Sequence, residues 1–187
     1  MNTKFLKSFA ILPCLALMLA QAATAADSSD ADRGQLSASD YKFAKKAAVG
    51  GMFEVTLGNV AQGNSSNNAV QQFGQHMVAD HGKAGQALTQ LASTKGAVLP
   101  TQLPEKFQKE VDHLSSLNGP DFDKAYITLM VKAHKADEKL FKSASEDVQD
   151  ADLKAFAANT LTIVQEHLKM AEDLENNVKH SLSMNNQ

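Results

Sequence analysis

The sequence predicts an all-α protein in which four long helices and one short helix form a four-helix bundle. Apolar residues recur at alternating three- and four-residue steps through four long stretches, which is the spacing of amphipathic helices. Clusters of Gly, Pro, Ser and Asn separate these stretches. No stretch alternates apolar and polar residues as a half-buried strand does. A bundle is the compact arrangement that buries four such apolar stripes.

Capping and breaking residues set the helix boundaries. We expect Ser39 or Asp40 to cap the first helix, Gly96 to end the second and Pro120 to open the third long helix. Between the second and third long helices, the segment AVLPTQLP breaks the chain before a short amphipathic piece. The expected helices, in chain order, are residues 39–62, residues 67–95, the short piece carrying Phe107, Val111 and Leu114, residues 120–147 and residues 151–180.

The N-terminus has the organisation of a secretory signal peptide. Lys4 and Lys7 precede the apolar run FAILPCLALMLA, and small residues around Ala25 offer a cleavage site. The apolar run is too short to span a membrane. We therefore expect export, most simply to the periplasm, with secretion or outer-membrane association left open. The expected segments are a signal peptide at 1–26, a disordered leader at 27–38, the bundle domain at 39–180 and a polar tail at 181–187.

Composition excludes several classes of function. Cys14 is the only cysteine and lies in the apolar run, so the mature chain has no disulfide and no thiolate metal ligand. Without Lys4 and Lys7 the chain has 16 basic and 21 acidic residues, a net charge of −5 that disfavours a nucleic-acid partner. No later segment is apolar enough to be transmembrane. The sequence leaves the protein partner and the oligomeric state unknown.

One polar residue interrupts the apolar stripe of each long helix. These residues are Glu54, His81, His134 and His167, each at a position where a bundle normally has an apolar side chain. Counted from the turns at 1.5 Å per residue, the two residues of each helical hairpin differ in depth by about 10 Å and about 5 Å. All four should therefore lie in the middle third of the bundle.

Two interpretations of this cluster stay open. Three neutral imidazoles and a carboxylate would bind one divalent transition metal, either zinc, iron, manganese or copper. The alternative is a metal-free hydrogen-bond network in an envelope or stress protein that acts through its surface. An unpaired polar group in a core costs a few kcal/mol, so in both cases the four side chains must bond to one another or to a metal. Asp80, His76 and Asp137 are candidate neighbours of the ligands, or solvated residues beside them.

No motif demands an enzyme. A phosphate-binding glycine loop, a dinucleotide fingerprint and a Ser-His-Asp arrangement are all absent. The segment EVDH at 110–113 has the Glu-x-x-His spacing of di-iron sites, but it falls in the short connector with His113 off the apolar stripe. We therefore assign no catalytic residues.

Several segments resemble an exported bacterial family known as domain of unknown function 4142. They are GGMFEVTLGNVA, VQQFGQHMVADH, GPDFDKAY, the third-helix His134 and EHL at 166–168, in this order over about residues 40–175. The resemblance implies a ferritin-like four-helix bundle and no known activity. The family's characteristic Glu and His positions correspond here to Glu54, His81, His134 and His167. Because the chain has one such glutamate and no Glu-x-x-His on a long helix, a mononuclear site fits it better than a di-iron site.

Overall fold

The computed structural model describes residues 31–184, with side chains as far as Val178. The predicted signal peptide and residues 185–187 lie outside this range. The described part of the chain is all-α, with no strand, as predicted. Its helices are α2 (Ala38–Asn64), α3 (Asn68–Thr94), α4 (Glu105–Ser115), α5 (Gly119–Asp147) and α6 (Ala151–Met184).

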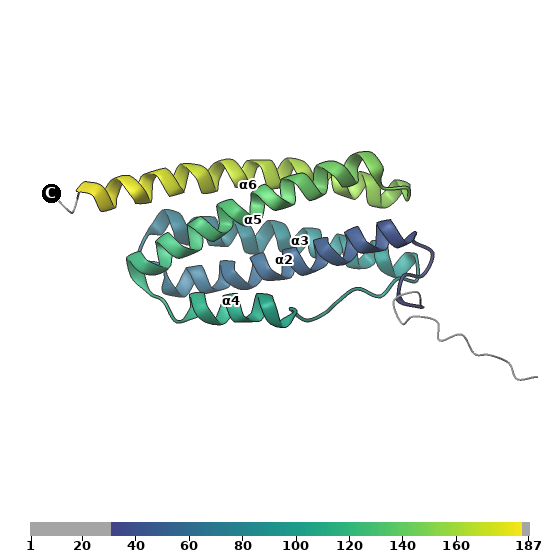
Figure 1. Cartoon of the computed structure of the whole chain (residues 1–187), viewed down its shortest axis with the longest axis horizontal. Helices are drawn as coiled ribbons and strands as arrows, with labels where there is room; N and C mark the ends of the chain where they lie inside the picture. Colours follow the sequence, from purple (N-terminus) through teal and green to yellow (C-terminus); the bar gives the residue numbers. More distant parts are fainter. Residues whose placement is uncertain (1–30, 185–187) are drawn as a thin grey trace, which may run out of the picture.

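The long helices form two antiparallel hairpins that pack against each other (Figure 1). Helix α2 pairs with α3 and α5 pairs with α6, while α2 faces α5 and α3 faces α6 across the bundle. Short helix α4 lies along α2 within the long connection from α3 to α5, so α3 and α5 run in the same direction. This arrangement confirms the predicted bundle with a short extra helix. None of the described helices has an apolar stretch of the length needed to cross a lipid bilayer.

The start of α2 differs from the prediction. Its N-cap is Ser37, whose hydroxyl accepts the backbone N–H of Asp40, rather than Ser39 or Asp40. Asp40 instead is buried and accepts the backbone N–H groups of Gln149 and Asp150, which precede α6. A carboxylate of α2 thereby satisfies unpaired donors at the start of a distant helix.

Part of the predicted disordered leader is ordered. The carbonyl of Asp32 accepts from the backbone N–H of Val98, and the N–H of Gln35 donates to the carbonyl of Lys95. Leu36 is 2 % exposed and belongs to the core. Gly34 has φ +55° and approaches so closely that a Cβ would lie 2.3 Å from the Lys95 carbonyl oxygen. The buried side chain of Leu36 and the close contact at Gly34 thus keep this polar segment ordered, although its composition predicted disorder.

Two apolar clusters fill the bundle on either side of its middle. One contains Phe43 and Phe141, whose rings meet edge to face at 5.4 Å. The other contains Phe73 and Tyr126, whose ring centroids are 6.1 Å apart. At this second end, Asp123 is buried and accepts hydrogen bonds from the hydroxyls at residues 65 and 66 in the α2–α3 turn. The polar residues predicted from the sequence occupy the space between the clusters.

Candidate metal centre

The four polar residues predicted on the apolar stripes are all buried in the middle of the bundle. Their exposed fractions are 2 % for Glu54, 6 % for His81, 0 % for His134 and 3 % for His167. They come from α2, α3, α5 and α6, one from each long helix. The structure brings the three histidines together, with one ring nitrogen of each within 4.8 Å of the others, whereas Glu54 is not part of this group. The three histidines could hold a metal ion.

His81 is fixed by Glu54. The distance from His81 Nδ1 to Glu54 Oε2 is 3.0 Å, so a proton on Nδ1 donates to the carboxylate. The other ring nitrogen, Nε2, lies 3.3 Å from Nδ1 of His167. When Nδ1 carries the only proton, Nε2 presents a lone pair to its neighbour.

His134 is fixed by the backbone of its own helix. Its Nδ1 lies 2.9 Å from the carbonyl oxygen of Met130, one turn earlier, and can only donate to it. Nε2 of the neutral ring therefore has a lone pair. That atom lies 3.5 Å from Glu54 Oε1, and neither of the two atoms has a hydrogen-bond partner.

His167 is fixed by Asp80, which precedes His81 on α3. The distance from His167 Nε2 to Asp80 Oδ2 is 3.1 Å, and the aspartate is only partly buried. With the proton on Nε2, Nδ1 of His167 has its lone pair directed at His81. The sequence suggested Asp80 as a neighbour of the site, and the structure places it in contact with a histidine.

Each imidazole thus has an acceptor on its outer nitrogen and a lone pair on its inner nitrogen. The inner atoms are Nε2 of His81, Nε2 of His134 and Nδ1 of His167. Ring centroids of the three pairs are 5.2 to 5.7 Å apart. Histidine ligands of metals usually donate their second N–H to a carboxylate or a carbonyl, which fixes the tautomer and the ring orientation. All three histidines have this arrangement.

Burial keeps the three rings neutral. It lowers the pKa of His81 and of His167 to about 4 in each case, and it also lowers the pKa of His134. Lone pairs on the inner nitrogens are therefore present at neutral pH, which is the state that binds a metal. Burial raises the pKa of Glu54, and it raises the pKa of Asp137 to about 8 together with the negative charge of Glu54.

A family comparison agrees with this architecture. The model of a domain of unknown function, DUF4142, matches residues 25–174. The chain belongs to the DUF4142 family. No curated protein and no solved structure matches it. The family model therefore supports the resemblance seen in the sequence, and the geometry of the site must supply the chemistry.

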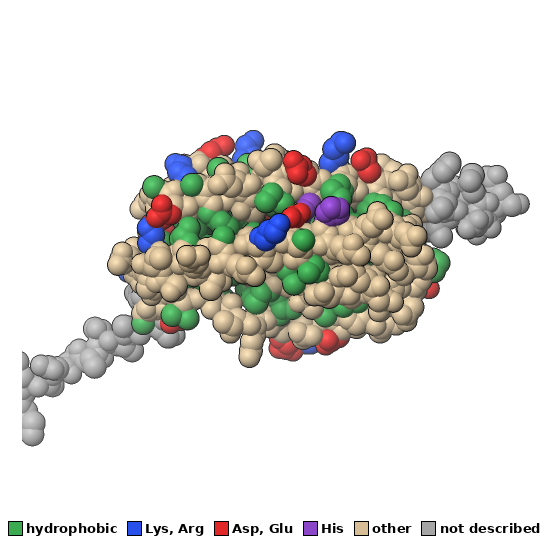
Figure 2. Space-filling view, turned by 180° about the vertical axis from the view of Figure 1, so that it is seen from behind, with side chains coloured by type: hydrophobic (Ala, Val, Ile, Leu, Met, Phe, Trp, Pro, Cys, Tyr) green, Lys and Arg blue, Asp and Glu red, His purple; other side chains and the backbone are tan. Residues whose placement is uncertain are grey.

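The remaining candidate residues of this DUF4142 chain lie at the edge of the site or outside it. Asp137 is partly buried beside Glu54, as its raised pKa indicates, whereas His76 is exposed on α3. Figure 2 shows histidine and acidic side chains next to each other on one face of the molecule. His113 is exposed on α4, as expected from the sequence, so the EVDH segment does not contribute to the centre.

Tyr126 is a further residue close enough to Glu54 to be affected by its charge, and the sequence pattern did not single it out. Tyr126 is fully buried two turns before His134 on α5, and its hydroxyl has no hydrogen-bond partner. Burial, together with the charge of Glu54, raises the pKa of this hydroxyl.

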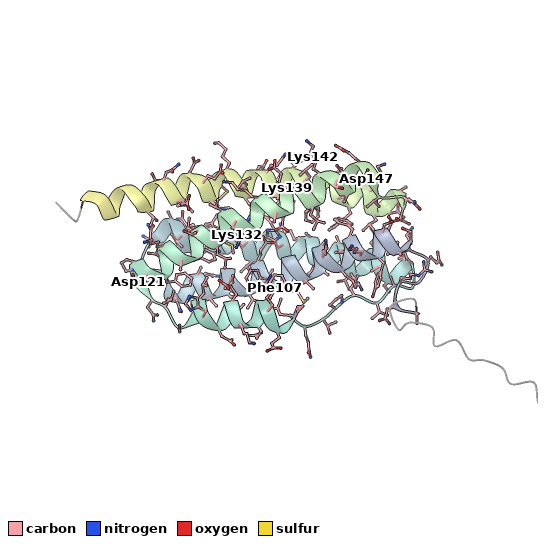
Figure 3. The ribbon with its side chains drawn as sticks, viewed as in Figure 1. Phe107, Asp121, Lys132, Lys139, Lys142 and Asp147 are labelled. Carbon is pink, nitrogen blue, oxygen red and sulfur yellow. The ribbon has the colours of Figure 1, made fainter. Side chains whose placement is uncertain are left out.

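The polar side of helix α5 carries Lys132, Lys139 and Lys142, which are exposed (Figure 3). The apolar stripe of the same helix carries the histidine.

Two hollows adjoin the centre. A cavity of about 20 Å³ is lined by Glu54, His81 and Asp137, among others. An open groove of about 1250 Å³ runs between α2, α3 and the segment after α3, and it also reaches His81. His81 therefore contacts both the inner cavity and the surface groove.

Proposed function

We propose that this protein binds one divalent transition metal in the middle of the bundle. His81, His134 and His167 would be the nitrogen ligands, and Glu54 would supply an oxygen ligand through Oε1. The observation that carries the proposal is that one potential ligand atom of each histidine lies within 4.8 Å of the others, while an acceptor lies beside the second nitrogen of each ring. Three imidazoles and a carboxylate suit zinc, iron, manganese or copper.

The energetics of the metal-free cluster support this proposal. Glu54 Oε1 and His134 Nε2 are both buried and without a hydrogen-bond partner, and both are acceptors as long as Glu54 is ionised. The facing nitrogens of His81 and His167, 3.3 Å apart, are a second pair of acceptors when His167 carries its proton on Nε2, facing Asp80. Leaving a buried acceptor unsatisfied costs about 1–3 kcal/mol. A cation placed among the three histidines would satisfy their ring nitrogens, and Glu54 Oε1, 3.5 Å from His134 Nε2, would lie close to it.

The competing interpretation is a metal-free network in a protein that acts through its surface. It needs a proton between the facing nitrogens of His81 and His167. The neutral Nδ1–H tautomer of His167 supplies one but turns a lone pair toward the carboxylate of Asp80. The other source is an extra proton that makes one ring an imidazolium, which the low pKa of both rings opposes at neutral pH. Glu54 favours it, since a carboxylate can neutralise an imidazolium. Metal handling or defence against oxidative stress is the role we propose for the metal-bound form.

We also propose that the protein is exported. The support is the N-terminal pattern of Lys4 and Lys7, an apolar run and small residues, which lies outside the described residues. The mature chain should begin at or near Ala26 or Asp27, without lipid. N-terminal sequencing and the mass of the mature protein check this, and an acylated Cys14 at the new terminus would contradict it.

Direct metal analysis tests the proposed function. Untagged protein purified from its native compartment, and metal-free protein dialysed against zinc, manganese, iron or copper, should each hold about one metal per chain. His134→Leu should lose this metal, whereas His113→Leu, which removes an exposed histidine of α4, should keep it. Protein that holds no metal under any of these conditions would overturn the proposal.

A further inference from the structure

We infer that the centre is open: the proposed metal keeps one coordination position for a ligand of one or two non-hydrogen atoms, such as water, dioxygen or peroxide. This inference rests on the proposed metal site and adds the class of molecule that the site would admit. It comes from the two hollows beside the centre rather than from the ligand set. A closed structural site would have no such space next to its ligands.

The inner cavity has the size of a single small molecule. Its volume of about 20 Å³ exceeds the roughly 10–15 Å³ that one water requires. Glu54 and His81 line it, whereas His134 and His167 do not. A ligand in the cavity would therefore approach the metal from the side of α2 and α3.

The cavity also offers polar groups to such a ligand. Asp137 and Thr160 line it together with Glu54 and His81, and the rest of its wall is apolar. A water molecule needs two to four polar partners to be held in a buried position. A diatomic oxygen species could use the same groups. Larger ligands would collide with Leu88, Phe141 and Phe156, which close the other side.

The surface groove leads to this cavity. Three residues line both hollows, namely Gly51, His81 and Gly85, so the cavity and the groove adjoin at these positions. A Cβ at Gly85 would meet no heavy atom within 4 Å, and a Cβ at Gly51 would be 3.9 Å from its nearest neighbour. Packing therefore does not require glycine at either position. Glycine in a helix interior costs about 1 kcal/mol relative to alanine, so these two glycines are maintained at a cost in helix stability.

Three glycine variants test the inference without endangering the fold. Gly50→Ala places a methyl group in the cavity, where its Cβ would be 3.7 Å from Asp137 Oδ1, an ordinary contact. Gly85→Val adds a larger side chain where groove and cavity adjoin. Gly82→Val is the matched control, because Gly82 lies on the same helix and lines the groove but not the cavity, and its Cβ also meets nothing within 4 Å.

The probe is nitric oxide added anaerobically to protein loaded with Fe²⁺, with iron content measured first. Wild type should bind nitric oxide at one per iron, seen by electron paramagnetic resonance, and should not bind imidazole, which is too large for the cavity. Gly50→Ala should weaken nitric oxide binding at least tenfold. Gly85→Val should slow both association and dissociation at least tenfold in stopped-flow measurements, with little change in affinity. Gly82→Val should behave as wild type.

The outcomes separate the two proposals. Loaded protein that binds no nitric oxide, or whose variants all bind it as wild type does, overturns the open position and leaves the metal site standing. Binding of imidazole with equal ease overturns the size limit. Protein that takes up neither Fe²⁺ nor the other metals overturns the metal site and the open position together.

Discussion

Tyr126 shows how a single polar group can be held in the core without compensation. Its hydroxyl is buried and has no hydrogen-bond partner, while its ring stacks on Phe122 with centroids 5.4 Å apart. Tyr126→Phe keeps the stacked ring and removes the unsatisfied hydroxyl. We expect the free energy of unfolding to stay the same or to rise by about 1 kcal/mol. Urea unfolding of the metal-free protein measures it, and a decrease above 1 kcal/mol would show that the hydroxyl has a partner.

Asp137 gives the metal-free protein a distinct pH dependence. Its pKa of about 8, raised by burial and by Glu54, means that the folded chain keeps a proton that the unfolded chain has lost at pH 7. Asp137 alone therefore lowers stability as pH rises from about 6.5 to about 8, by at most about 1.4 kcal/mol per pH unit. The histidines oppose this trend up to about pH 7, because their rings are neutral in the folded chain while unfolded histidines still bind part of a proton, so the fall in stability should be clearest between about pH 7 and 8.

The check is a set of urea unfolding curves between pH 6.5 and 8 in the presence of chelator. Asp137→Asn should flatten the slope, since an amide does not titrate. Asp121→Asn, which alters an exposed carboxylate at the start of α5, is the control and should leave the slope unchanged. Equal slopes for wild type and Asp137→Asn would contradict the assignment.

At the residue scale, the burial of Glu54 and the three histidines could be predicted because the helical period alone decides which side chains face the core. Glu54 and His167 illustrate this, since each replaces an apolar residue at a regular step of its stripe. Their hydrogen bonds could not be predicted. The contact of His167 with Asp80 spans 87 positions and depends on the rotation of two helices about their axes. The unsatisfied hydroxyl of Tyr126 likewise depends on packing that no periodicity describes.

At the element scale, the centre depends on how closely α2 approaches α3. A Cβ at Gly58 would lie 2.6 Å from the carbonyl oxygen of Gly74, and one at Gly74 would lie 2.8 Å from that of Gly58. The two backbones therefore touch, one turn after Glu54 and two turns before His81. This approach supports the 3.0 Å contact between the carboxylate and the imidazole.

Gly58→Ala should force these helices apart. We expect a loss of about 2 kcal/mol in the free energy of unfolding, because overpacking costs about 1–3 kcal/mol and exceeds the gain in helix propensity. Metal affinity should fall as well, since Glu54 moves away from His81. Gly63→Ala, on the same helix but with nothing within 4 Å of the added Cβ, should be neutral or stabilising by up to about 1 kcal/mol. Equal stability of the two variants in urea unfolding would contradict the close approach.

The helices could be predicted from the sequence, whereas the hydrogen bonds between residues far apart in the chain could not. Helix boundaries matched within a few residues because caps, glycines and prolines are local signals. The buried role of Asp40 required knowing that the N–H groups of residues 149 and 150 come to it across 109 and 110 positions. The ordered leader around Gly34 was missed for the same reason, since its partners follow α3.

At the scale of the whole molecule, each of the two hairpins contributes residues to the proposed site. Helices α2 and α3 supply Glu54 and His81, and α5 and α6 supply His134 and His167. A metal bound among them would join the hairpins at the middle of the bundle, between the two apolar clusters. Binding should therefore stabilise the whole fold rather than one helix. The gain is RT ln(1 + [metal]/Kd), about 2.7 kcal/mol when free metal is a hundredfold above Kd.

The most direct measurement is the thermal melt of untagged wild type and His167→Leu, each with chelator and with added zinc, manganese, iron or copper. At least one metal should raise the melting temperature of wild type, and chelator should lower it again. His167→Leu should lose this response, while His113→Leu, the exposed-histidine control, should retain it. If the cluster is only a polar network, replacing a costly buried ring by leucine should be neutral or stabilising. No metal response in wild type, together with an equal or higher melting temperature of His167→Leu, would contradict the metal site.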